Sequence, residues 1–150
     1  MHIKSGFKQA AVIATAAAIV TLTGCASQGM MRAQEVNVAL RGDSEVPANT
    51  TTASGMATFR VNPDKTLSGL VQTSDVIGSA AHIHMGKAGS NGPVIVGLVQ
   101  TGGSSFAVPS GAAFTDDQYR AFQAGETYVN VHSLGYPGGQ IRGQLNPFSR

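Results

Sequence analysis

The feature that most constrains the fold is a series of short segments in which apolar and polar residues alternate. Such alternation places every second side chain on the same face of a β-strand. The segments are separated by turns rich in glycine, proline, asparagine and aspartate, which end strands. They comprise residues 35–41, 53–61, 66–73, 80–85, 126–132 and 140–145. The pattern predicts an all-β domain, an antiparallel Greek-key β-sandwich or barrel.

Three further segments complete the predicted elements. Residues 94–99 are apolar on both faces, so we expect a buried strand there, and residues 104–108 form a further short strand. A single short helix should begin after Thr115, because Gln118 follows three residues later and completes a capping box. Gly125 is a natural end for this helix.

The N-terminus has the organisation of a bacterial export signal. A basic stretch, residues 1–8, precedes an apolar run at residues 10–22 that is too short to span a bilayer comfortably. The next residues, Leu22-Thr23-Gly24-Cys25, resemble the lipobox of bacterial lipoproteins. That resemblance implies cleavage before Cys25 and its diacylation, which anchors the new N-terminus in a membrane. The alternative is an ordinary signal peptide with an incidental cysteine.

The predicted processing divides the chain into three parts. Residues 1–24 are the signal peptide, residues 25–34 a tether, and residues 35–150 a single domain. Ala26 stands after the cysteine in place of aspartate, which favours the outer membrane of the cell envelope. The ten basic residues exceed the eight acidic ones only through Lys4 and Lys8 of the signal peptide. Because the remaining chain has no net charge or basic patch, we expect no nucleic-acid partner.

Three of the four histidines form a candidate metal site. His82 and His84 flank Ile83 in an alternating segment, so they share one face, while Ala81, Ile83 and Met85 face the core. His132 ends a second alternating segment. If the two strands are neighbours, three imidazoles converge, and such a set suits copper or zinc.

A metal site also needs acceptors for the outer ring nitrogens of its histidines. The candidate acceptors are Asn130, Gln140 and Asp75, and Arg142 is a further second-shell candidate. The alternative is structural: the histidines would hydrogen-bond backbone and side chains around a glycine-rich turn and the final hairpin.

No catalytic constellation stands out, so we expect a protein that is not an enzyme. Ser133 lies beside His132, but adjacency in sequence does not create a nucleophile with a positioned base. The glycine-rich stretch 86–92 differs from a phosphate-binding loop, because Pro93 and a β-type segment follow it instead of a helix.

Five segments in order resemble the CHRD domain, the module named after chordin. They are Gly42–Pro47, Gly55–Phe59, Ala81–Gly86 with Gly92-Pro93, Tyr128–His132 and Gly138–Gln144. The similarity spans residues 35–145, although Gln140 stands where the family usually has glutamate. The resemblance implies a β-sandwich outside the cytoplasm and little about activity. We therefore expect a lipid-anchored, non-catalytic binding or structural module for an envelope protein or glycan; the alternative is a copper- or zinc-binding protein using the three histidines.

Overall fold

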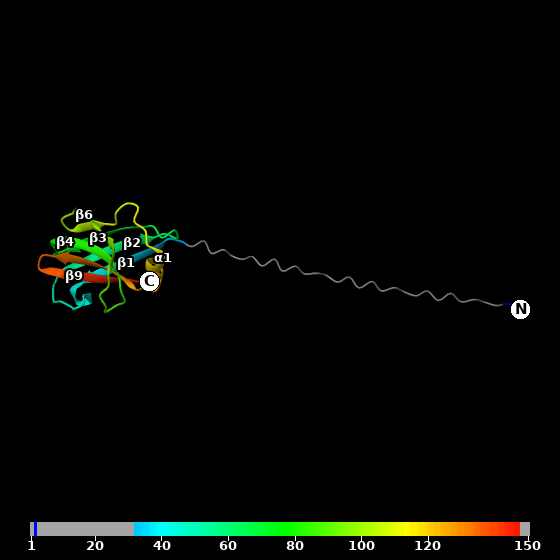
Figure 1. The fold of residues 1–150 in the computed structure, drawn as a ribbon, viewed down its shortest axis with the longest axis horizontal. Helices are drawn as coiled ribbons and strands as arrows, with labels where there is room; N and C mark the ends of the chain where they lie inside the picture. The colour runs from blue at the N-terminus through cyan, green and yellow to red at the C-terminus, as the bar shows by residue number, and fades with distance from the viewer. Residues whose placement is uncertain (1, 3–31, 148–150) are drawn as a thin grey trace. The chain divides into compact units, whose positions relative to one another are not determined.

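Nine β-strands and one α-helix make up the described part of the chain (Figure 1). The computed structural model describes residue 2 and residues 32–147; the predicted signal peptide and Cys25 lie outside the described residues. The elements are β1 (Gln34–Arg41), the 3-10 turn η1 (Gly42–Ser44), β2 (Ser54–Val61), β3 (Leu67–Ser74), β4 (Gly78–Met85), β5 (Val94–Gly97), β6 (Val99–Gly102), β7 (Ser105–Ala107), α1 (Asp116–Gln123), β8 (Thr127–Ser133) and β9 (Tyr136–Leu145).

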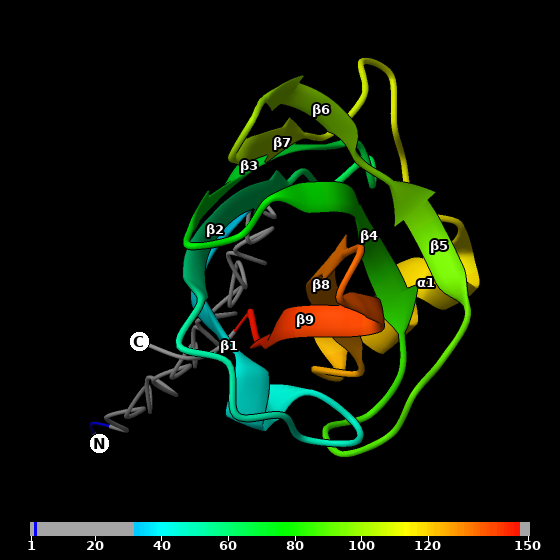
Figure 2. The same ribbon diagram turned by 90° about the vertical axis from the view of Figure 1, so that its left-hand side faces the viewer.

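All strand pairs are antiparallel, and the sheet curls into a nearly closed barrel (Figure 2). The strand order is β5-β4-β8-β9-β1-β2-β3-β7-β6. The two end strands, β5 and β6, are consecutive in the chain and separated only by Leu98. At this kink the Leu98 amide donates to Ala81 O of β4 (2.9 Å). One kinked strand therefore bonds to β4 with its first half and to β7 with its second. The prediction of an antiparallel all-β domain with one short helix is confirmed.

The hydrophobic core fills the barrel interior. Alternate residues of each wall strand point into it, and their burial is nearly complete. In β2 these are Ala57, Phe59 and Val61, as the alternation predicts. The strands that carry the histidines contribute Ala81, Ile83, Val129 and Val131. Because these side chains face inward, their neighbours in the same strands must face outward.

The expectation of a buried strand at residues 94–99 is wrong. The segment is broken at Leu98, and only Val96 is buried. Val94 and Val99 remain 51% and 53% exposed. The physical reason is that, among residues 32–147, no second layer covers the outer face of the barrel wall here, so the outward residues of this segment are exposed although they are apolar.

Helix α1 forms with the predicted capping box. Thr115 Oγ1 accepts from Gln118 N (3.2 Å), and Gln118 Oε1 accepts from Thr115 N (2.9 Å). Gly125, with φ of 70°, follows the end of the helix. The helix is held to the domain by its buried Phe122, whose ring packs against that of Phe114 with the ring centroids 5.8 Å apart. No helix in the described residues has the length and apolar character needed to cross a membrane.

Candidate metal centre

The three histidines lie together on the outer face of the barrel wall. Strands β4 and β8 are neighbours, and their register pairs Ala80 with His132, His82 with Asn130, and His84 with Tyr128. This register places the His132 pair two residues along the ladder from the His82 pair, on the same face of the sheet and opposite the buried Ala81. Two adjacent strands therefore supply all three imidazoles.

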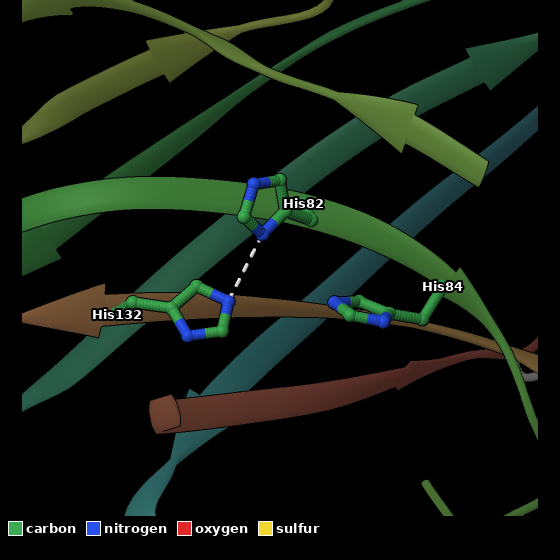
Figure 3. A group of neighbouring side chains, drawn as sticks. All are labelled: His82, His84 and His132. Atoms are coloured by element: carbon green, nitrogen blue, oxygen red, sulfur yellow. Dashed lines mark hydrogen bonds between the residues drawn. The ribbon is translucent and has the colours of Figure 1, made fainter. Parts of the chain in front are cut away.

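The ring nitrogens of the three side chains converge (Figure 3). His82 Nδ1 lies 3.0 Å from His132 Nε2, and the far nitrogen of His84, Nε2, points toward both rings. One nitrogen from each residue lies within 4.8 Å of the other two. A tetrahedral zinc ion with ordinary Zn–N bonds separates its ligand nitrogens by about 3.3 Å. Side-chain movements on the order of 1 Å would therefore bring the three nitrogens to ligand spacing.

Two of the rings are fixed from behind by backbone carbonyls. His84 Nδ1 donates to Gly92 O (2.9 Å), and His132 Nδ1 donates to Pro137 O (3.0 Å). A carbonyl oxygen only accepts, so Nδ1 carries the proton in each of these bonds. In neutral His132 the lone pair then lies on Nε2, the nitrogen that faces the cluster. His84 Nε2 also faces the cluster but lies 3.0 Å from Asn130 Oδ1, so a neutral His84 ring donates to only one of its two acceptors, Gly92 O or Asn130 Oδ1. Bonds from Nδ1 to backbone carbonyls are the outer hydrogen bonds that metal-binding histidines require.

The four candidate second-shell residues occupy different places. Asn130 is next to the cluster, with its Oδ1 3.0 Å from His84 Nε2. Arg142 is buried, and its guanidinium lies over the ring of Tyr128, 3.4 Å from the ring centroid. The Tyr128 ring in turn stacks on the His84 ring. Gln140 instead donates to Thr51 Oγ1 (3.0 Å), and Asp75 is exposed in the turn before β4. The structure thus brings Asn130 to the histidines and leaves Gln140 and Asp75 elsewhere.

Two loops, residues 42–49 and 86–93, cover part of this polar face, and we call them the roof loops. Arg142 holds the second one by donating to Ser90 O (2.8 Å), Lys87 O (3.3 Å) and Asn91 Oδ1 (3.2 Å). Asn91 Nδ2 then donates to Val46 O of the first loop (2.7 Å). This bonding leaves Arg142 only 2% exposed. The glycine-rich stretch 86–92 therefore serves as a connection between two strands, as the sequence indicated.

Glu45 is a functional candidate that the sequence did not reveal. Its carboxyl group belongs to the first roof loop, is only 5% exposed, and its Oε1 has no hydrogen-bond partner among the described residues. Burial raises the pKa of Glu45 to about 7, against the opposing effects of the Arg142 charge, the Val46 amide and the Asn130 side chain. In sequence it is one of several acidic loop residues, and no local pattern marks it as buried.

The electrostatics of the cluster favour neutral imidazoles. Burial lowers the pKa of His82, and the neighbouring His132 and His84 lower it further. Burial also lowers the pKa of His132, although its bond to Pro137 O acts in the opposite direction. Metals bind the neutral imidazole, so these shifts extend the pH range in which the two rings are ready to act as ligands.

Comparison with known proteins identifies one family. The model of the CHRD domain matches residues 36–145, which is nearly the whole barrel from β1 to β9. No curated protein and no solved structure matches the chain.

Proposed function

Since the chain belongs to the CHRD-domain family, we propose that it is a non-catalytic binding module, lipid-anchored in the cell envelope, whose ligand is a copper or zinc ion. The observation that carries this proposal is the convergence of one nitrogen each from His82, His84 and His132. Family membership supports a binding or structural module, and the histidine cluster supplies the binding chemistry.

The hydrogen bonding presents ring nitrogens in a way that suits a cation site. The carbonyls of Gly92 and Pro137 hold the Nδ1 side of two rings, so that Nε2 of each ring faces the same space. In the metal-free protein a single proton can bridge His82 Nδ1 and His132 Nε2. A bound ion would displace that proton, and any proton between His84 Nε2 and Asn130 Oδ1, and would accept a lone pair from each of the three rings.

The donor set favours copper or zinc among the common metals. Imidazole nitrogens suit both ions, whereas calcium and magnesium prefer carboxylate and carbonyl oxygens. Neither a carboxylate nor a thiolate belongs to the three-histidine cluster. Copper(II) generally binds a given set of nitrogen donors more tightly than zinc, so copper is the stronger test of the site.

The envelope location rests on the sequence. Cys25 follows Leu22-Thr23-Gly24 in the lipobox-like stretch, and the first strand begins at Gln34. The residues between them would form a short tether between a diacylated cysteine and the barrel. This arrangement would hold the domain close to the membrane to which the lipid attaches.

Elemental analysis and calorimetry test the metal site. Full-length protein purified without chelator should contain or take up about one copper or zinc ion per chain, with a dissociation constant below micromolar. The double variant His82→Ala with His84→Ala should lose this uptake. Gln72→Ala, a change on the outer face of the distant strand β3, is the matched control and should retain it. A metal-free wild type that also fails to bind either added ion would overturn the proposal.

A further inference from the structure

The side of the histidine cluster next to strand β5 is bordered by residues without bulky side chains. Gly97 pairs with His82 across β4 and β5, and Ala80 pairs with His132 across β4 and β8. Paired residues share a face of the sheet, so these two positions border the rings. A Cβ atom built on Gly97 would meet no heavy atom within 4 Å. The space beside His82 is therefore open.

The opposite side of the cluster is closed. Asn130, next to His82 on β8, is almost fully buried, and Arg142 follows it on β9 beneath the roof loops. His84 is buried with them, whereas His82 and His132 are only half-buried. The three nitrogens therefore sit at the margin of the roof, between a covered side and an exposed side.

We infer that an ion held by these histidines has its fourth coordination position open to solvent at the exposed margin of the cluster, where it takes a small exchangeable donor from solution. This inference rests on the proposed metal site. Structural metal sites close all four positions with protein ligands, while sites that exchange ligands or react keep one open. A water molecule or a small monodentate anion fits the space, and a donor atom from another molecule can displace it.

Azide binding to the copper(II)-loaded, full-length protein tests the inference. The protein is saturated with copper(II), freed of excess ion, and titrated with azide, while the azide-to-copper charge-transfer absorption and the copper electron paramagnetic resonance are recorded. An open position predicts a saturable new absorption band and a changed resonance spectrum. The His82→Ala, His84→Ala double variant should show neither, because it lacks two of the ligands.

The outcomes separate the two proposals. If the protein takes up no copper at the histidines, the metal site itself is wrong. If copper binds but azide changes neither spectrum, the metal site stands and the open position is refuted; Asn130 Oδ1, 3.0 Å from His84 Nε2, then becomes the candidate fourth ligand.

Discussion

Replacing Glu45 by glutamine should change how the stability of the domain depends on pH. Burial raises the pKa of Glu45 from 4.5 to about 7 in the folded protein, whereas the unfolded chain leaves the group near its usual value. Between these two pH values the folded state binds more protons than the unfolded state. Linkage then requires the contribution of Glu45 to stability to fall as pH rises from about 4.5 to about 7, and to stay low above that pH.

The magnitude follows from the size of the shift. One pKa unit corresponds to about 1.4 kcal/mol, so the full shift would cost the wild type ~3 kcal/mol at pH 8. We expect about half of this, ~1–2 kcal/mol, because water around the roof loops screens the charge. Glutamine keeps the size of the side chain and its acceptor oxygen but cannot ionise. Glu45→Gln should therefore be close to wild type in stability at pH 5 and more stable than wild type at pH 8.

Urea unfolding of the metal-free protein at several pH values between 5 and 8 measures the difference. The lowered pKa values of His82 and His132 act in the opposite sense, since protonation of these rings favours the unfolded state and stability falls as the solution becomes more acidic. This contribution is common to both proteins and cancels when they are compared at each pH.

Glu35→Gln is the matched control for this comparison. Glu35 is exposed on β1 and forms an ion pair with Arg60 (3.0 Å), so its loss should change the free energy of unfolding by less than about 1 kcal/mol at any of these pH values. Parallel pH profiles for Glu45→Gln and wild type would refute the reasoning. An advantage of the wild type that grows with pH would refute it as well, because it would mean that the ionised carboxylate is stabilised in the folded protein.

Three further predictions concern the roof, the metal and the anchor. Arg142→Met should lower the free energy of unfolding by about 2–4 kcal/mol in urea denaturation, because carbonyl groups of the second roof loop lose their buried donor and Tyr128 loses the cation over its ring. Arg142→Lys should recover only part of this loss. Equal stability of all three proteins would contradict the role of the guanidinium. Zinc at about 100 times its dissociation constant should stabilise the wild type by ~2.7 kcal/mol and raise its melting temperature, and His132→Gln should abolish this effect. The stabilisation should weaken as the solution is acidified, because protons then compete with zinc for the nitrogens of His82 and His132. A zinc-induced rise of the same size in the variant would exclude His132 as a ligand. Cys25→Ser should move the protein from the membrane fraction to the soluble fraction and remove the mass of the lipid from its N-terminus, whereas unchanged fractionation would point to an anchor other than this cysteine.

Much of the barrel wall and the grouping of the histidines was predictable because both depend on local periodicity. Alternation alone placed His82 and His84 opposite Ala81 and Ile83, and the structure buries the latter two completely. The hypothesis that His132 would join them needed only that β4 and β8 be neighbours, which they are. The helix start at Thr115 was equally local, since a capping box spans four residues.

The roof was not predictable, because its contacts join residues far apart in the chain. Asn91 bonds to Val46, and Arg142 bonds to Ser90, across separations of 45 and 52 residues. In an alternating pattern, polar residues on the outer face are expected to meet solvent. Burial of Arg142 and Glu45 depends on loops folding back over that face, and neither residue carries a local sign of it. The burial of residues 94–99 also depends on distant parts of the chain. Their apolar composition predicted burial on both faces, but Val94 and Val99 are about half exposed.

The kink at Leu98 has a consequence for association between molecules. An open sheet exposes unpaired amide and carbonyl groups along its outermost strands, and a long exposed edge can recruit a strand from another chain. Here a single strand is divided between the two ends of the sheet, so each remaining edge is only four residues long, in β5 and in β6. The Leu98 amide is already bonded to Ala81 where the two halves meet. Short edges interrupted in this way make poor templates for intermolecular β-pairing, which protects the barrel from edge-to-edge aggregation.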